Sequence, residues 1–342
     1  MTSLRDVLSR RRDDVPFDVV RAAYCELHVT NLEASRHFYV DLLGLVESAR
    51  TADTLYLRGW EEQTHHALVL RERPTVGAAR LAFRVRTPGD LDAVEQEFVR
   101  RECEVERVSG ALAGMGDAVR VWDPFGFPLE FFHEIARFPT QLQRFDLHRG
   151  APIMRFDHLN IHAPFVEETT ELWLDLGFHC TEYISTDGDG ERLTGCWLSR
   201  KSLVHDVAMT AGTGPRLHHT GLATADPLSV LRACDQLAAA GHADVIERGP
   251  GRHGVSNAFF VYLRDPDGHR IELYACDYYT GDPDHPPLRW SVSDPSCRSF
   301  WGAKAPDSWY DESSVVLDRN GNPTPIGEAG VDERTARSVL MA

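Results

Sequence analysis

Two stretches of the chain show the same succession of hydrophobic and polar positions. Residues 24–45 (YCELHVTNLEASRHFYVDLLGL) and 157–178 (DHLNIHAPFVEETTELWLDLGF) each begin with an alternating run, which is typical of a strand. A turn and a pattern of helical period follow in both. Each helix is expected to end at a glycine, Gly44 or Gly177, the residue preferred just after a helix. The repeat predicts a chain built from duplicated units.

A second pair of matching segments completes the repeat. Residues 121–132 (VWDPFGFPLEFF) and 263–274 (LRDPDGHRIELY) each contain an Asp-Pro-x-Gly turn that leads into a strand. Between these landmarks each half holds one further strand and helix, expected at 81–86 and 87–101, and at 218–224 and 225–241. Each half is therefore predicted to contain two strand–helix–strands units.

The units predict an α+β fold with two domains. A chain of 342 residues is long enough for two cores of ordinary size. The halves meet near residues 136–152, and a tail rich in Pro, Asp and Trp follows residue 277. The predicted division is an N-terminal extension (1–17), a first domain (18–140), a second domain (152–277) and a C-terminal tail (278–342).

The composition narrows the classes of partner. Hydrophobic residues make up 42% of the chain and charged residues 26%, as in globular proteins. The net charge of −16 argues against nucleic acid or an anionic membrane as partner. An anionic substrate would therefore need a local cluster of arginines.

The chain shows no sign of export or membrane insertion. No run of about 18 apolar residues occurs, so no transmembrane helix is expected. The N-terminal sequence MTSLRDVLSRRRDDVP lacks the apolar core of a signal peptide. The seven cysteines are scattered and form no CxxC pair, which favours a reduced cytoplasm.

Three residues of the second half form a candidate metal site. His158, His219 and Glu272 fall at corresponding places in the strands of its two units. Two imidazoles and one carboxylate are the ligand set of non-heme Fe(II) oxygenases, which leave positions open for substrate and oxygen. The three strands would have to curve around one cavity for these residues to meet.

The first half lacks this ligand set. Tyr24 aligns with His158, and the apolar stretch 81–82 aligns with His219. Only Glu130, which aligns with Glu272, keeps the ligand type. The first domain is therefore predicted to be a degenerate, metal-free copy.

Most of the 16 histidines need no special role. A histidine on a strand is more often a surface residue or a satisfied core residue than a metal ligand. We place His162, His179 and His218 in this ordinary class. The glycines of the segment 247–274 do not have the spacing of a phosphate-binding loop, and the segment does not open a helix.

The segment 247–274 carries a family resemblance. Its pattern resembles the signature of extradiol ring-cleaving catechol dioxygenases of the vicinal oxygen chelate superfamily. Further segments, FDHLN, CWLSRKSLVHD, GPRLHH, IERGPGRHGVSNAF and DYYTGDPD, are similar to homoprotocatechuate (3,4-dihydroxyphenylacetate) 2,3-dioxygenases. The residues of the signature are Gly251, His253, Val261, Tyr262, Asp265, Pro266, Gly268 and Glu272.

The resemblance implies a fold and a cofactor. It implies four βαβββ modules that form two vicinal-oxygen-chelate domains, followed by a C-terminal lid. It implies Fe(II), or alternatively Mn(II), bound by His158, His219 and Glu272. It also implies a homotetramer, and the tryptophans of the tail fit the lid: Trp290, Trp301 and Trp309.

The resemblance also implies roles around the metal. His205 would be the acid–base group that donates a proton so that the O–O bond breaks, because imidazole titrates near neutrality. Tyr262 would hydrogen-bond a substrate oxygen. Asn160 and Trp197 would orient the ring, and His253 would close the cavity.

One departure concerns the substrate. Arginine is the natural anchor for a carboxylate arm, and Arg248 and Arg298 stand at positions associated with the cavity and lid. Relatives carry an arginine pair in the lid where this sequence has Cys297 followed by Arg298. The loss of one charge leaves open a para-substituted catechol with a longer or neutral arm.

The resemblance predicts an extradiol, or meta-cleaving, dioxygenase of aromatic catabolism. It would insert both atoms of O2 into a para-substituted catechol, with 3,4-dihydroxyphenylacetate as first choice, and give a muconic semialdehyde. The alternatives are the same chemistry on another 4-substituted catechol, or a metal-dependent lyase on the same fold. A 2-oxo-acid-dependent dioxygenase lacks the His253–Tyr262 signature, and a metal-free binding protein would not need the ligands.

Overall fold

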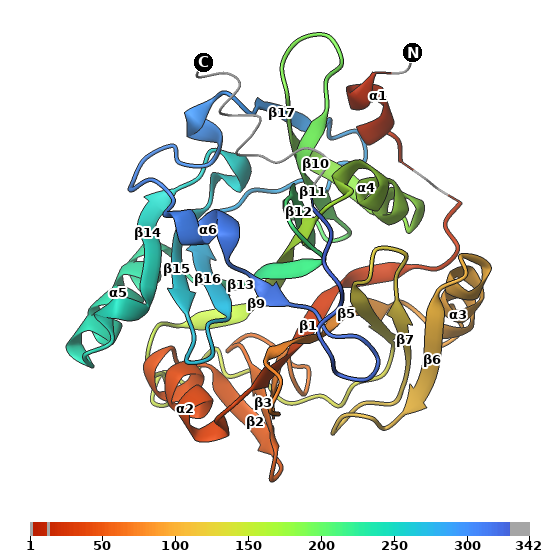
Figure 1. Cartoon of the computed structure of the whole chain (residues 1–342). Helices are drawn as coiled ribbons and strands as arrows, with labels where there is room; N and C mark the ends of the chain where they lie inside the picture. The colour runs from red at the N-terminus through yellow and green to blue at the C-terminus, as the bar shows by residue number, and fades with distance from the viewer. Residues whose placement is uncertain (1–2, 12–13, 329–342) are drawn as a thin grey trace.

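The computed structural model describes residues 3–11 and 14–328, which form two β-sheets with helices on their flanks (Figure 1). The first sheet has eight strands in the order β2-β3-β4-β1-β5-β8-β7-β6. Its strands are β1 (Val19–Val29), β2 (Val46–Arg50), β3 (Thr54–Arg58), β4 (Leu68–Glu72), β5 (Gly77–Val85), β6 (Glu104–Ser109), β7 (Asp117–Trp122) and β8 (Pro128–Phe132).

The second sheet repeats this order, as β14-β15-β16-β13-β9-β12-β11-β10, and adds β17 at its edge and β18 beside β13. Its strands are β9 (Ile153–Ala163), β10 (His179–Ser185), β11 (Leu193–Ser199), β12 (Val207–Ala211), β13 (Arg216–Thr224), β14 (Ile246–Arg252), β15 (Phe259–Arg264), β16 (Arg270–Ala275), β17 (Leu288–Ser291) and β18 (Ser314–Val315).

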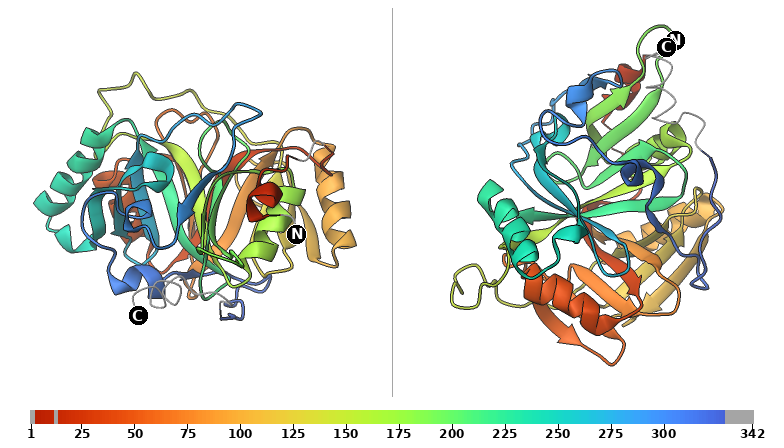
Figure 2. Two further views of the ribbon diagram at one scale, coloured as in Figure 1. Left: turned by 90° about the horizontal axis from the view of Figure 1, so that it is seen from above. Right: turned by 60° about the vertical axis from the view of Figure 1, so that its left-hand side comes forward.

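The principal helices follow the first strand of each unit. Figure 2 shows them on the outside of the molecule, with the strands of both sheets between them. The succession is βαβββ, four times over, so the predicted α+β fold is confirmed. The helices are α2 (Leu32–Arg36), continued by a π-helical turn (His37–Leu42), α3 (Asp90–Arg100), α4 (Val166–Asp175) and α5 (Pro227–Ala239), with short helices α1 (Leu4–Leu8) and α6 (Asp307–Asp311).

Local sequence explains where these helices begin and end. The Asp226 side chain accepts a hydrogen bond from the backbone N–H of Ser229, and Pro227 occupies the first turn of α5. Gly44 and Gly177 adopt φ values of +89° and +85° just after their helices. Glycine reaches this left-handed region without steric cost, so the predicted helix ends are confirmed.

The two sheets share one hydrophobic core. Phe83 of the first sheet packs with its ring centroid 5.0 Å from that of Trp173 and 6.0 Å from that of Phe178. Both partners are buried and belong to the second half. The halves are therefore fixed against each other by apolar contact, while the predicted boundaries at 18–140 and 152–277 stay predictions.

The strand register corrects one part of the sequence alignment. Tyr24 pairs with Ala82 as His158 pairs with Gly221. Two positions before Ala82 on the same strand stands Arg80, which is therefore the counterpart of His219, so the predicted match to residues 81–82 was wrong. Successive side chains of a strand point to opposite faces, so a shift of one or two positions decides which residue takes a ligand's place.

The C-terminal segment crosses from the second domain to the first. After α6, β18 pairs with β13, and Val316 then bridges to Ala78 of β5. The backbone N–H of Leu317 donates to the Ala78 carbonyl, and its own carbonyl accepts from the Trp122 indole at 3.2 Å. Residues 329–342 of the predicted lid lie outside the described residues. In the described chain, no helix has the length and apolarity to cross a membrane.

Candidate metal centre and its cavity

The three predicted ligands converge at the centre of the second sheet. His158 lies on β9, His219 on β13 and Glu272 on β16, and these strands are neighbours. One ligand atom from each lies within 4.8 Å of the others, and all three side chains are buried. Glu272 Oε2 is 3.0 Å from His158 Nε2 and 3.2 Å from His219 Nε2.

These separations fit a divalent cation. Two ligand atoms at roughly 2.1 Å from one metal ion and at right angles are about 3 Å apart. Two imidazoles and a carboxylate also match the donor set of a facial triad. The three residues can therefore hold a divalent metal with little rearrangement.

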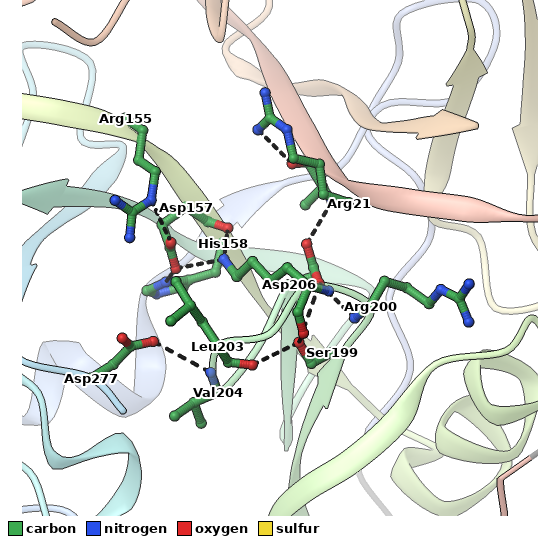
Figure 3. Close-up of polar contacts among 12 residues, drawn as sticks. Arg21, Arg155, Asp157, His158, Ser199, Arg200, Leu203, Val204, Asp206 and Asp277 are labelled. Atoms are coloured by element: carbon green, nitrogen blue, oxygen red, sulfur yellow. Dashed lines mark hydrogen bonds and ion pairs between the residues drawn. The ribbon is translucent and has the colours of Figure 1, made fainter. Parts of the chain in front are cut away.

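The first histidine has its metal-binding nitrogen fixed by a neighbour. His158 Nδ1 lies 3.2 Å from Oδ2 of the buried Asp157. A carboxylate accepts hydrogen bonds, so Nδ1 carries the hydrogen and Nε2 presents its lone pair toward Glu272. Figure 3 shows Asp157 between His158 and Arg155, whose Nε is 3.3 Å from Asp157 Oδ1.

The second histidine is fixed through a chain of two hydrogen bonds. His218 Nε2 donates to the Trp309 carbonyl at 2.9 Å, which leaves His218 Nδ1 as an acceptor. His219 Nδ1 lies 2.6 Å from that atom and must donate to it. His219 Nε2 is then unprotonated and free for a metal, so a carbonyl of the C-terminal segment sets the tautomer of a ligand.

The local electrostatics favour an ionised carboxylate at the centre. Burial raises the pKa of Glu272, but its close contacts with His158 and His219 outweigh burial and hold that pKa well below its ordinary value. Burial lowers the pKa of His219 to about 4. The site therefore presents one anionic and one neutral ligand in the forms that bind metal.

A glycine makes room for the first histidine. A Cβ atom at Gly221 would lie 2.2 Å from Cε1 of the His158 ring, which no side chain could tolerate. The space at Gly221 is taken up by the His158 imidazole itself.

A cavity of about 500 Å3 opens beside the three ligands. All seven residues predicted to act around the metal line it, on β9, β11, β14, β15 and the connecting loops: Asn160, Trp197, His205, Arg248, His253, Tyr262 and Arg298. Each is at least nine-tenths buried. The structure thus gathers every predicted site residue around one cavity.

His253 and Tyr262 form a directed pair at the cavity wall. His253 Nδ1 donates to the Arg298 carbonyl, since a carbonyl can only accept. Burial lowers the pKa of His253, so the ring is neutral and its Nε2 accepts from the Tyr262 hydroxyl at 2.9 Å. The Tyr262 oxygen keeps lone pairs that can accept a hydrogen bond from a ligand in the cavity.

His205 lies beside His158 and faces the cavity. Its ring centroid is 4.0 Å from that of His158, and its side chain lines the cavity. Burial, and then the neighbouring His158, lower the pKa of His205 well below its ordinary value. A neutral imidazole at this place can accept a proton and return it.

The loop that carries His205 is held by Asp206. The carboxylate of Asp206 accepts hydrogen bonds from the backbone N–H groups of Arg200 and Lys201, at 2.7 and 3.1 Å, and of Ala22, at 2.8 Å (Figure 3). Ala22 belongs to the first sheet, so the first domain anchors the loop. Lys201 in turn donates to Asp157 Oδ2 at 2.8 Å, which ties this loop to the first ligand.

The two arginines bring positive charge to the cavity. Arg248 lies over the Trp309 ring, with Cζ 4.4 Å from the ring centroid, and donates to the Arg298 carbonyl at 2.9 Å. Cys297 is fully buried in an apolar cluster with Trp197 and does not line the cavity. The residue that interrupts the expected arginine pair therefore lies behind the wall.

Sequence reasoning missed several residues at the site. His162 and His218 were placed among ordinary histidines, yet both are buried and line the cavity. The signal for His218 was its place directly before a predicted ligand. Of the three tail tryptophans, Trp309 lines the cavity, Trp290 donates to Glu182 at 2.6 Å, and Trp301 is 48% exposed.

Comparisons with known proteins agree with this geometry. The model of the Glyoxalase/Bleomycin resistance protein/Dioxygenase superfamily matches residues 21–131 and 155–273. A manganese-dependent 2,3-dihydroxybiphenyl 1,2-dioxygenase of Geobacillus genomosp. 3 is 32% identical, over 80% of this chain and 90% of that protein. A metapyrocatechase of Geobacillus stearothermophilus is 30% identical, over 90% of this chain and 98% of that protein.

Solved structures give the same picture. A homoprotocatechuate 2,3-dioxygenase of Arthrobacter globiformis is 48% identical with a TM-score of 0.89, covering 92% of this chain and 97% of that one. An extradiol ring-cleaving dioxygenase of B. fuscum is 45% identical with a TM-score of 0.90, covering 94% and 90%. These matches confirm the family resemblance predicted from the sequence.

Proposed function

The chain belongs to the Glyoxalase/Bleomycin resistance protein/Dioxygenase superfamily, and on this premise we propose that it is an extradiol dioxygenase. The reaction would break the ring bond next to one of the two hydroxyl-bearing carbons of a catechol. Dioxygen is the oxidant, the ring supplies the electrons, and both oxygen atoms remain in the product, a muconic semialdehyde. The chain then acts in the breakdown of aromatic compounds.

One observation carries the proposal. His158, His219 and Glu272 form a facial set, and His219 and Glu272 line a cavity whose wall also holds an acid–base candidate, a phenol hydroxyl and two arginines. A metal-dependent lyase would need the ligands and an acid–base group. It would not need a neutral histidine and a tyrosine on either side of an open coordination face.

A divalent metal bound to the three ligands would supply the contact through which the catechol oxygens and dioxygen exchange charge. Fe(II) is our first choice and Mn(II) the second, because both favour this donor set and one relative is manganese-dependent. The protein itself holds the reactants side by side, which replaces a bimolecular encounter by a local one.

The chain's own groups would handle protons at defined atoms. The Tyr262 hydroxyl oxygen can accept a hydrogen bond from one catechol hydroxyl, while its own hydrogen points to His253 Nε2. The neutral His205 imidazole can take the proton that leaves the catechol and donate it to the reduced oxygen. Asn160 and Trp197 at the wall would orient the ring.

We propose 3,4-dihydroxyphenylacetate as the substrate. Its carboxylate arm suits Arg248 and Arg298, which are both buried at the cavity wall. Cys297 lies in an apolar cluster behind the cavity wall, so the absence of an arginine at this position leaves Arg248 and Arg298 at the cavity. A neutral 4-substituted catechol has no carboxylate to accept hydrogen bonds from these guanidinium groups.

The test is oxygen uptake and visible absorbance after anaerobic loading with Fe(II) or Mn(II). We expect one dioxygen consumed per 3,4-dihydroxyphenylacetate, a yellow product, and much weaker turnover of 4-methylcatechol. Turnover of 4-methylcatechol alone would keep the chemistry and overturn the substrate. No uptake with either compound by protein that holds one metal per chain would overturn the dioxygenase.

Assembly and location are part of the proposal. The family resemblance supports a homotetramer, which light scattering of the purified protein would test. No disulfide joins any of the cysteines in the described residues, and this supports the reduced cytoplasm. An inactive enzyme after mild oxidation, restored by thiol, would agree with that location.

A further inference from the structure

A second cavity lies in the first domain, at the place that the metal centre occupies in the second. Its volume is about 500 Å3, the same as that of the metal-site cavity. Part of its wall is formed by Glu26, His28 and residues 317–321 of the C-terminal segment. We call it the arginine cavity after the five side chains that line it: Arg71, Arg73, Arg80, Arg120 and Arg319.

The strand register shows that the two cavities are copies. Glu26 pairs with Arg80 across β1 and β5, as Asn160 pairs with His219 across β9 and β13. Asn160 and His219 line the metal-site cavity at the corresponding places. The duplication therefore preserved the hollow and replaced its lining.

The new lining excludes a cation. Arg80 occupies the place of a metal ligand, and its Nε is 3.9 Å from Glu130 Oε2. Arg120 Nε donates to the same oxygen at 2.8 Å, and the Tyr24 hydroxyl donates to the other one. The carboxylate that matches Glu272 is thus neutralised by protein groups, and positive charge faces the cavity.

The arginines keep donors beyond those that their ion pairs use. Arg71 Nε donates to Glu26 at 2.6 Å, and Arg73 Nη1 donates to Asp53 at 2.8 Å. A guanidinium has five N–H groups, so one such bond orients the side chain and leaves others for a ligand. Among the described residues, the buried Nε of Arg80 has no hydrogen-bond partner.

The cavity gathers five arginines in a chain whose net charge is −16. Each is paired with a carboxylate in or behind the cavity wall, which fixes its side chain in place: Glu26, Asp53, Glu104, Glu106 and Glu130 are these partners. Burial, and then the nearby Arg120, lower the pKa of Arg80, while Glu26 and Glu130 act in the opposite direction. An anion in the cavity would accept hydrogen bonds from the guanidinium N–H groups that these ion pairs do not use.

We propose that the arginine cavity is a binding site for a small oxyanion, a phosphate or a carboxylate. The anion lies in the hollow that would hold the catechol in the other domain, under residues 317–321. It is bound by guanidinium groups from β4, β5, β7 and the C-terminal segment. The site is separate from the metal centre and does not depend on the proposed ring cleavage.

The test is isothermal titration calorimetry of the metal-loaded protein with inorganic phosphate and with succinate, at constant ionic strength set with chloride. The double variant Arg73→Gln, Arg319→Gln removes two arginines at the cavity mouth, which are 38% and 53% exposed, so it should fold. The matched control is Arg144→Gln, an exposed arginine paired with Asp146 and far from the cavity lining.

We expect one oxyanion per chain, bound at least about tenfold more weakly by the double variant and equally well by the control. Phosphate alone, succinate alone or both in the titration would identify the chemistry of the ligand. No saturable binding of either, or equal binding by the double variant, would overturn the proposal. Displacement of the anion by anaerobic 3,4-dihydroxyphenylacetate would also overturn it, because the anion would then lie at the metal centre.

Discussion

The two domains place a buried carboxylate at the same point of the same sheet and stabilise it in different ways. Glu272 faces two imidazoles arranged for a metal, whereas Glu130 faces Arg80 and Arg120 and accepts from Tyr24. A buried carboxylate needs compensating charge, and either a cation or protein groups can supply it. In the first domain, arginines and a tyrosine therefore supply the compensation that a metal ion could supply in the second.

The two domains also differ in the residues that contact the imidazole ligands or their counterparts. In the second domain Asp157 and His218 fix the tautomers of the ligands, and the matching residues of the first domain are Ala23 and Ala79. Supporting groups persist only where there are imidazoles to orient. The comparison separates residues that serve the metal from residues that serve the sheet.

The largest expected effect comes from neutralising each carboxylate in turn. Glu272→Gln should reduce bound metal from about one per chain to almost none, and turnover by about three orders of magnitude or more, because one of three ligands is lost. Glu130→Gln should keep the metal and lower the free energy of unfolding by about 3–5 kcal/mol, because buried arginines lose their partner. Elemental analysis and denaturant unfolding measure the two.

A second contrast concerns the small residue beside the first ligand. Gly221→Ala should displace the His158 ring and weaken metal binding by about tenfold or more, because the new Cβ would overlap the imidazole. Ala82→Gly at the matching position should keep the metal and cost about 0.5–1 kcal/mol of stability. Metal titration of apoprotein would decide, and unchanged affinity in Gly221→Ala would contradict the geometry.

A third contrast isolates the relay to the C-terminal segment. His218→Phe should weaken metal binding by roughly 10–100-fold, because His219 Nδ1 loses its acceptor and the tautomer is no longer fixed. The control is His162→Phe, at a buried histidine whose ring centroid is 4.6 Å from that of His218 but which bonds no ligand. Equal losses in both variants would mean that bulk, not the relay, matters.

The smallest effect separates the two Asp-Pro turns. Burial raises the pKa of Asp123 to about 7, and its Oδ2 has no partner among the described residues, whereas Asp265 Oδ2 accepts from Tyr39 at 3.0 Å. A raised carboxyl pKa contributes stability that is fully present below the unfolded value, near pH 4, and lost as the pH rises toward 7.

Replacing Asp123 removes this titration. In Asp123→Asn the stability advantage over the wild type should grow by about 1 kcal/mol or more between pH 4 and pH 7, because asparagine does not ionise. Thermal unfolding of both proteins across this range measures it. Melting curves that shift in parallel with pH would show that Asp123 is ionised in the folded state.

The sequence predicted what depends on local pattern. Repeated alternation and helical periods predicted the four units, and the ligand types predicted the metal centre. It could not predict the register of β5, where Arg80 rather than residues 81–82 matches His219. Register is set by pairing between strands distant in the chain, which a single sequence does not display.

The role of the C-terminal segment was also beyond the sequence. Trp309 reaches His218 across 91 positions of the chain, and only the path of the backbone brings its carbonyl there. The sequence repeat likewise did not predict the arginine cavity, because its five arginines are spread over about 250 residues of the chain. Local patterns identify chemistry, and the fold decides which groups share a cavity.

The path of residues 309–317 has a consequence for the order in which the protein matures. All strands except β18 leave the ribosome before this segment, so a growing chain can pair them while residues 309–317 are still missing from both cavities. The Trp309 carbonyl that orients His219 arrives after every ligand has been made. We expect the metal to be bound firmly only after residues 309–317 have been made, so that a shorter nascent chain holds it weakly and reacts less with oxygen.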